Sequence, residues 1–163
     1  MIRVQKYQDL GRFQNAWLNA HYHFSFSGYH NPERMGHGAL RVINDDIVRG
    51  GGGFQMHPHR DMEIITYVRK GAISHRDNLG NKGKTEAGNV QVMSAGTGIF
   101  HSEHNLENVD TNLYQIWIEP NEEGVKPRWE AREFPKKVGS GLSLLASGLP
   151  EHQKSGAIFM HAD

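Results

Sequence analysis

The fold of this chain is decided by two histidine-bearing segments, Gly51-Gly52-Gly53-Phe54-Gln55-Met56-His57-Pro58-His59-Arg60-Asp61-Met62-Glu63 and Gly96-Thr97-Gly98-Ile99-Phe100-His101-Ser102-Glu103-His104-Asn105. In an extended strand, residues two apart point to the same side. His57 and His59 therefore share one face of their strand, and His101 and Glu103 share one face of theirs. If the two strands lie side by side with these faces inward, three imidazoles and a carboxylate converge. Such a set of donors predicts a metal site.

Strand alternation alone leaves open which carboxylate completes the site. Glu63 has the same parity as the first histidine pair, whereas Glu103 lies two residues from His101. If Glu103 is the ligand, Glu63 can instead be the acceptor that orients an imidazole N–H group. His104 points away from His101 by the same alternation and is not a candidate.

The composition restricts both the metal ligands and the binding partners. The chain has 163 residues, and 18 basic side chains balance 18 acidic ones, so no net charge attracts the protein to nucleic acid or to an anionic membrane. Cysteine is absent, so a metal must take nitrogen and oxygen ligands. The first residues lack the apolar core of a signal peptide, and no segment is apolar enough to span a bilayer. We therefore expect a cytoplasmic protein.

Most of the remaining histidines are expected to have no role in a site. His75, His152 and His161 have no partner pattern, and we expect them on the surface. The segment His21-Tyr22-His23 repeats the His-x-His spacing, but no partner histidine follows it at a useful distance before His57. Packing in an aromatic cluster is the better interpretation of that segment.

The pattern of short apolar runs between glycine-containing turns predicts an all-β sandwich or barrel. The strongest strand prediction covers residues 112–119, where apolar and polar side chains alternate. A strand is also expected over residues 39–48, with a bend at Asn44-Asp45-Asp46. No amphipathic helix of convincing length is present.

The character of the chain changes after Pro120. Residues 136–141 are expected to form a linker, and residues 142–146 and 157–161 to form two strands that have no sheet of their own. We therefore expect one domain over residues 1–135. Residues 136–163 would be a linker and the truncated start of a second domain.

The two histidine segments are close to the paired motifs of the cupin barrel. The first fits Gly-x5-His-x-His-x3-Glu-x7-Gly between Gly51 and Gly71, and the second fits Gly-x5-Ser-x-Gly-x4-His-x3-Asn between Gly88 and Asn105. The chain departs from the usual motifs by one extra residue before Gly71, by serine in place of proline at position 94, and by two extra residues before His101. These departures indicate a divergent branch with shifted turns.

That branch resembles the pirin family. The resemblance rests on His57-Pro58-His59-Arg60-Asp61-Met62-Glu63 followed by Met93-Ser94-Ala95-Gly96-Thr97-Gly98-Ile99-Phe100-His101-Ser102-Glu103, and extends over roughly residues 10–135. The chain looks nearest to bacterial pirin-like proteins described as quercetin 2,3-dioxygenases. The resemblance implies a cupin fold, a jelly-roll β-barrel or double-stranded β-helix, in two tandem domains of which only the first binds metal. The C-terminal segment would then be an incomplete second cupin-like segment.

The resemblance also implies the ligands and the metal. By the pirin pattern the metal ligands are His57, His59, His101 and Glu103. Three imidazoles and a carboxylate suit several divalent transition metals, namely iron, zinc, copper, nickel, manganese and cobalt. Pirin-like proteins are usually discussed with iron, so Fe(II) is the expected ion.

Two functions of different classes follow from the resemblance. The first is an oxidoreductase that opens the central ring of a flavonol such as quercetin with O2 and releases carbon monoxide; Glu103 would be the catalytic base that takes the proton of the 3-hydroxyl group. The pocket walls are expected from apolar residues of the barrel interior, with candidates Phe54, Met56, Ile99 and Ile116, whereas Trp117 is expected in the core. The second is a metal-binding regulatory protein with a protein partner and no turnover of its own. Missing parts of a second domain would favour a homodimer.

Overall fold

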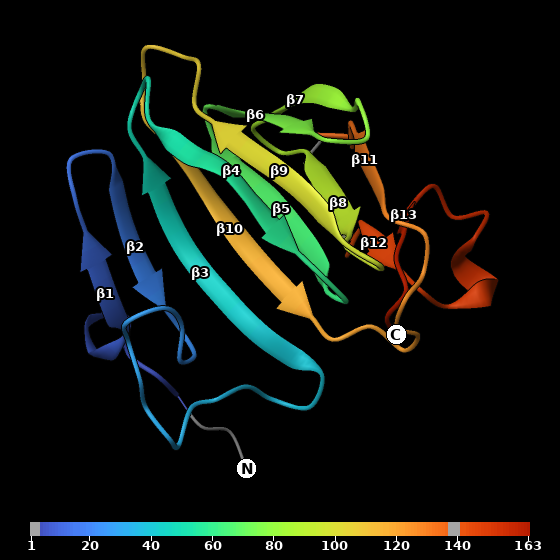
Figure 1. Ribbon diagram of the computed structural model, residues 1–163, viewed down its shortest axis with the longest axis horizontal. Coiled ribbons are helices and arrows are strands. Elements are labelled where there is room, and N and C mark those ends of the chain that lie inside the picture. Colours follow the sequence, from blue (N-terminus) through green and yellow to red (C-terminus); the bar gives the residue numbers. More distant parts are fainter. Residues whose placement is uncertain (1–3, 137–140) are drawn as a thin grey trace.

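The computed structural model describes residues 4–136 and 141–163, and these form two facing β-sheets (Figure 1). The larger sheet has seven antiparallel strands in the order β1-β2-β3-β10-β5-β8-β11. Their bounds are Gly11–Gln14 for β1, Leu18–Tyr22 for β2, Leu40–Val48 for β3, Glu63–Lys70 for β5, Val90–Ser94 for β8, Thr111–Ile118 for β10 and Arg128–Arg132 for β11.

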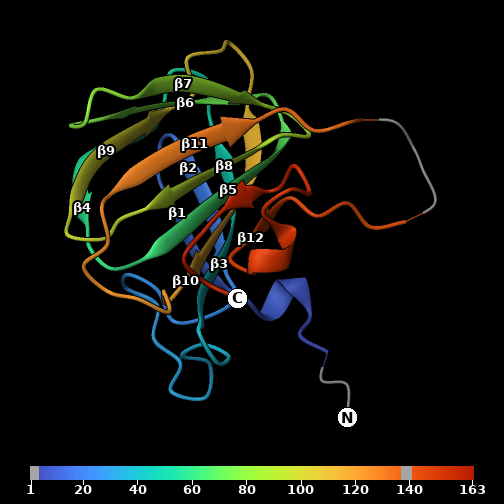
Figure 2. The same cartoon turned by 90° about the vertical axis from the view of Figure 1, so that its right-hand side faces the viewer.

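The smaller sheet has four antiparallel strands in the order β4-β9-β6-β7, and it lies over the β5 and β8 end of the larger sheet (Figures 1 and 2). Its strands are β4 (Gly53–His59), β6 (Ala72–Asp77), β7 (Lys82–Glu86) and β9 (Ile99–His104). Both histidine segments thus become paired strands of one sheet. The predicted all-β class is confirmed.

Side-chain alternation along β5 separates an inner from an outer face of the larger sheet. Val68 packs inward with Ile73 of β6, in a core that also contains Leu18, Ala20, Tyr22, Val48 and Leu113. The outer face of β8 exposes Val90 and Val92 to a different cluster, which the C-terminal segment covers. Each strand that is buried on both faces therefore contributes to two separate cores.

The C-terminal segment packs on that outer face (Figure 2). Its strands β12 (Ala146–Ser147) and β13 (Ile158–Phe159) pair in parallel with each other, so the two expected strands have a small sheet of their own. Ile158 is fully buried against Val90 and Val92. Residues 137–140 of the expected linker lie outside the described residues.

Helical structure in the described part of the chain consists of short 3-10 turns, η1 (Tyr7–Asp9) and η2 (Pro150–His152). No helix among the described residues has the length and apolar character needed to cross a membrane. The structure of this protein is therefore set by strand pairing, as the sequence predicts.

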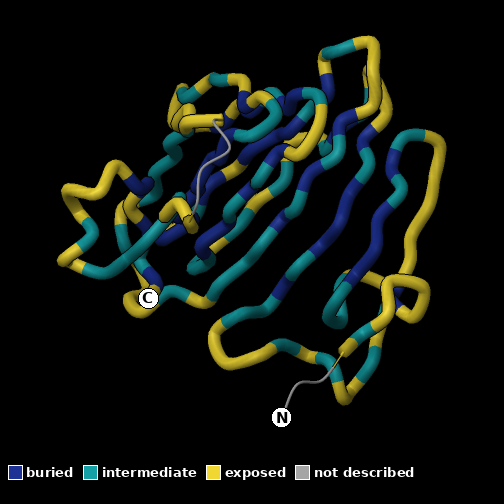
Figure 3. Tube along the Cα trace, turned by 180° about the vertical axis from the view of Figure 1, so that it is seen from behind, coloured by how far each residue is buried: buried dark blue, intermediate teal, exposed yellow. Residues whose placement is uncertain are grey.

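Strand β3 runs without a break through the bend expected at residues 44–46, and that expectation is wrong. This stretch is paired on one side with β2 and on the other with β10, so the ladder holds it extended. Asn44, Asp45 and Asp46 are all buried. Figure 3 shows that buried segments of the chain run across the sheets, whereas most loops are exposed. Polar residues that suggest a turn are here the interior residues of a central strand.

Candidate metal centre

The histidines of β4 and β9 meet because these two strands are direct neighbours. His57 pairs with His101 across the ladder, and a register shift between Phe54 and His57 inserts one extra residue into β4 just before this pair. The Nε2 atoms of His57 and His101 are 3.1 Å apart, and the ring of His59 lies 4.8 Å from that of His57 and 4.9 Å from that of His101. One nitrogen of each ring lies within 4.8 Å of the others, which is the spacing that a single ion can bridge.

The rings of His57 and His101 make hydrogen bonds at Nδ1, which leaves their Nε2 atoms free to face each other. His57 Nδ1 lies 2.6 Å from the carbonyl oxygen of Gln55, so the Nδ1–H group donates and Nε2 keeps its lone pair. His101 Nδ1 lies 3.4 Å from His75 Nδ1, and His75 Nε2 lies 3.0 Å from Asp77 Oδ2. If the Asp77 carboxylate accepts from His75 Nε2, then His75 Nδ1 is the acceptor for His101 Nδ1–H. His101 Nε2 is then available as a ligand.

His75 is a correction to the sequence analysis, which expected it on the surface. Its side chain is 1 % exposed, and its ring stacks on Trp129 with centroids 4.6 Å apart. The signal that could have identified it is its parity with Asp77 on β6, a strand that pairs with β9. Burial lowers the pKa of His75, whereas the hydrogen bond and charge of Asp77 oppose that shift.

Burial keeps the rings of His59 and His101 neutral near pH 7. Burial, followed by the charge of His57, lowers the pKa of His59 to about 4. Burial, followed by the charges of His57, His59 and His75, lowers the pKa of His101 to about 2. Neutral imidazoles are the form that binds metal ions, so little proton release from these two rings accompanies binding.

Glu103 lies behind the histidines, with its carboxylate held by the larger sheet. Thr66 Oγ1 and Gln91 Nε2 donate to Oε1 at 3.3 and 2.6 Å, and Gln115 Nε2 donates to Oε2 at 2.8 Å. Burial raises the pKa of Glu103 to about 7, although these three donors oppose the shift. Its carboxylate lies within 4.8 Å of ring nitrogens of His75 and His101. The structure therefore brings His57, His59 and His101 into one cluster and places Glu103 in a second cluster, which shares only His101 with the first.

Glu63, the alternative carboxylate, faces the other side of the larger sheet. It pairs with Ser94 on β8, whose Oγ donates to Glu63 Oε2 at 2.8 Å. It is buried beneath the C-terminal segment near His161 and belongs to neither cluster of candidate ligands among the described residues. We considered Glu63 as the acceptor that orients an imidazole N–H group. For His57 this acceptor is the carbonyl oxygen of Gln55 instead.

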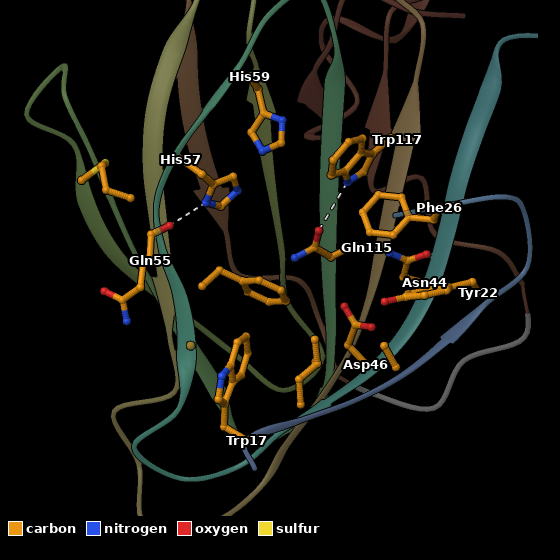
Figure 4. Close-up of a pocket in the computed structure, with 15 residues that line it drawn as sticks. Trp17, Tyr22, Phe26, Asn44, Asp46, Gln55, His57, His59, Gln115 and Trp117 are labelled. Atoms are coloured by element: carbon orange, nitrogen blue, oxygen red, sulfur yellow. Dashed lines mark hydrogen bonds between the residues drawn. The ribbon is translucent and has the colours of Figure 1, made fainter. Parts of the chain in front are cut away.

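A cavity of about 460 Å³ opens beside His57 and His59 (Figure 4). Phe54 and Met56 line it as expected, but Ile99 belongs to the core with Ile64, Met93 and Ala95 instead. The remaining lining residues are Trp17, Leu18, Ala20, Tyr22, Phe26, Asn44, Asp46, Gly53, Gln55, Gln115 and Trp117. Trp117, expected in the core, has its ring edge-on to His59 with centroids 4.8 Å apart.

The family model for Pirin matches residues 3–118 of this chain. The chain belongs to the pirin family. The "Quercetin 2,3-dioxygenase" of Escherichia coli strain K12 is 45 % identical over 164 residues, which cover 100 % of this chain and 69 % of that protein. The "Pirin-like protein" of Caulobacter vibrioides is 55 % identical over 152 residues, which cover 93 % of this chain and 66 % of that protein.

A solved structure agrees with this pirin in fold. The crystal structure of bacterial pirin YhhW from Escherichia coli in complex with nickel(II) has a TM-score of 0.91 and 46 % identity, covering 100 % of this chain and 69 % of that one. This chain thus spans about two thirds of the length of these relatives. The predicted family and its cupin fold are confirmed.

The donor set of this pirin fits a divalent transition metal. Its imidazoles and carboxylate are nitrogen and oxygen donors of the kind that bind nickel, iron, cobalt or zinc. The rings of His57 and His101 are held by hydrogen bonds on the side away from the convergence point, as metal-binding histidines usually are. The described residues therefore fit a metal ion at the inner end of an aromatic cavity.

Proposed function

We propose that this pirin is a metal-dependent dioxygenase that opens the central ring of a flavonol such as quercetin with O2. The observation that carries the proposal is the convergence of His57, His59 and His101 beside a cavity that has tryptophan, tyrosine and phenylalanine rings in its walls. A relative that is 45 % identical carries the name quercetin 2,3-dioxygenase, which supports the same reaction class. Ligand pockets of a few hundred cubic ångströms with few polar groups suit such a planar molecule.

We propose His57, His59, His101 and Glu103 as the metal ligands and Fe(II) as the ion. His57 and His101 can offer their inward nitrogens without loss of the hydrogen bonds at Nδ1. A carboxylate has about four lone-pair sites. Three donors bind Glu103, so one site remains for the ion or for a proton. A related pirin structure contains nickel(II), which supports a site of this donor type.

The metal centre and the cavity have separate tasks in this reaction. A bound metal ion supplies Lewis acidity, which makes a coordinated hydroxyl group more acidic. Glu103 takes the proton of the flavonol 3-hydroxyl group, and burial raises its pKa to about 7, close to the value that suits a base at neutral pH. Trp117 and Phe54 lie against the flat rings and exclude water.

A turnover assay tests the proposal. Protein loaded separately with Fe(II) and Ni(II) is mixed with quercetin, and the loss of flavonol absorbance is followed together with O2 uptake. We expect one O2 consumed per quercetin, a loss of at least about 100-fold in His57→Ala, and near-normal rates in His104→Ala. His104 is a suitable control because it lies on the same strand as His101 and bonds to Gln55 on the other side. Retained metal without turnover would contradict the enzyme and favour a regulatory protein.

We also propose that residues 1–135 form the metal-binding cupin domain and that residues 136–163 are the linker and start of a second one. The family match ends at residue 118, and this chain covers 69 % of the length of the Escherichia coli relative. The paired strands β12 and β13 cover an outer sheet face rather than the site. Replacement of residues 141–163 by the matching segment of a relative should leave metal affinity unchanged.

A further inference from the structure

The inner face of the larger sheet carries a row of polar side chains that extends beyond Glu103. Cross-strand pairing places Gln91, Thr66, Gln115 and Asn44 in consecutive register on β8, β5, β10 and β3. The first three donate hydrogen bonds to Glu103. Asn44, the next in the row, has no such role, and it lines the cavity instead.

Two buried oxygen atoms at this end of the cavity have no partner. Asn44 Oδ1 and Asp46 Oδ1 are buried and make no hydrogen bond to any part of the chain that the structure describes. Their residues are 3 % and 2 % exposed, and both line the cavity. A buried polar atom without a partner costs free energy. A group on the bound ligand is therefore the natural partner for this pair.

The two oxygens and the metal-binding histidines lie on opposite walls of the cavity. Asn44 and Asp46 come from β3 of the larger sheet, whereas His57 and His59 come from β4 of the smaller sheet. Figure 4 shows Gln115 between His57 and Asp46, with Asn44 and Tyr22 farther from the histidines. A ligand that reaches the histidines at one end would present its other end to the oxygen pair.

The surroundings of the pair select the chemical class of that ligand group. The aromatic rings of Tyr22, Phe26, Phe54 and Trp117 line the same cavity, so the ligand part that enters here is apolar and flat. Burial, followed by the charges of Glu103 and Asp45, raises the pKa of Asp46 to about 8, so at neutral pH it is mainly a carboxylic acid. A cation would find no counter-ion. A phenolic hydroxyl both donates and accepts, so it can pair with an amide oxygen and with a carboxyl group.

We propose that Asn44 and Asp46 form a subsite that binds a phenolic hydroxyl group at the end of the substrate remote from the metal-binding histidines. The subsite rests on the proposed function and makes it more specific. The substrate is a flavonol that carries hydroxyl groups on its outer rings, and these two residues determine its specificity. A site built to bond a hydroxyl group disfavours an analogue that lacks it, because its polar atoms are then left unpaired.

The test compares two ligands on the nickel-loaded protein without O2. Quercetin carries hydroxyl groups on its outer rings, whereas 3-hydroxyflavone keeps only the 3-hydroxyl and the neighbouring carbonyl group. Their dissociation constants are measured by quenching of tryptophan fluorescence, since Trp17 and Trp117 line the cavity. We expect the wild type to prefer quercetin by at least about 10-fold. Asp46→Leu should reduce that preference to about 2-fold or less while leaving the affinity for 3-hydroxyflavone unchanged.

Two further variants make the comparison decisive. Asp45→Asn alters the neighbouring residue, which faces the opposite side of β3 and pairs with Arg69, and it should keep the full preference for quercetin. Asn44→Leu removes the other oxygen, Asn44 Oδ1. It also keeps the test possible if Asp46→Leu does not fold. The subsite is overturned if both leucine variants keep the wild-type preference for quercetin, or if they lose affinity for quercetin and for 3-hydroxyflavone equally. Absence of quercetin turnover in the wild type, with the binding preference intact, contradicts the dioxygenase and not the subsite.

Discussion

His75 Nδ1 lies 3.4 Å from His101 Nδ1, and the other nitrogen of His75 lies 3.0 Å from Asp77 Oδ2. The carboxylate fixes the proton of His75 on Nε2, which makes Nδ1 an acceptor for the proton of His101. These two hydrogen bonds hold the ring of His101 in the tautomer that binds a metal through Nε2. His75 is therefore a positioning residue. It contacts His101 at Nδ1 and not at Nε2, the nitrogen proposed to bind the ion.

Substitution of His75 separates this positioning role from packing. His75→Phe keeps the ring on Trp129 but removes the acceptor, whereas His75→Asn can place an amide oxygen near the former Nδ1 atom. We expect the phenylalanine variant to bind nickel about 10- to 100-fold more weakly and the asparagine variant to stay closer to the wild type. Competition with a chelator measures the affinity. The reverse order of the two variants would show that His75 acts only through packing.

The affinity for metal should decrease as the pH is lowered, because Glu103 takes up a proton. Its pKa is raised to about 7, while those of His59 and His101 are lowered to about 4 and about 2, so of these three groups the carboxyl group is the one that takes up a proton between pH 8 and pH 6. A metal must displace this proton, so we expect the dissociation constant for nickel to rise about 10-fold from pH 8 to pH 6. Calorimetry in buffers of different ionisation enthalpy should show the proton release at pH 6. A dissociation constant that does not change between pH 8 and pH 6 would contradict this role of Glu103.

The stability of the metal-free protein should depend on pH through the ionisation of Asp46. Its pKa is raised to about 8 in the folded state from an ordinary value of 3.8, so the unfolded chain loses this proton first. The wild type therefore loses stability as pH rises from about 4 to about 8. Asp46→Asn does not ionise, so its melting temperature relative to the wild type should rise by at least about 3 °C between pH 6 and pH 8. A constant difference over this range would show that Asp46 is already ionised in the fold.

The C-terminal segment should contribute stability but no function to the metal centre. Ile158 is fully buried on the outer face of the larger sheet, away from the cavity. Ile158→Ala should lower the free energy of unfolding by about 2 to 4 kcal/mol, with unchanged affinity for nickel. Phe159→Ala is the matched control, because that neighbouring side chain is 38 % exposed. Weaker metal binding in Ile158→Ala would show that the segment also supports the site.

The all-β fold and the three convergent histidines could be predicted because both depend on local alternation. His57 and His59 share a face whatever the rest of the chain does, and the match to a known pair of motifs supplies the partner strand. Glu63 shares that parity only if its strand continues β4. It begins β5 instead, in the other sheet, so its side chain faces away from the site.

Long-range pairing explains what the sequence analysis missed. His75 becomes important only because β6 lies beside β9, a neighbour that no local pattern indicates. Asn44 and Asp46 suggest a turn by composition, but two flanking strands hold them extended and buried. Trp117 lies two residues beyond Gln115 on the same face of β10, so a residue expected in the core becomes a wall of the cavity.

Anomalous diffraction from a crystal of the nickel-loaded protein tests the central claim most directly. We predict one strong peak, about 2.1 Å from the Nε2 atoms of His57 and His101, from a ring nitrogen of His59 and from a carboxylate oxygen of Glu103. A peak bound only by surface histidines, or none at this position, would contradict it.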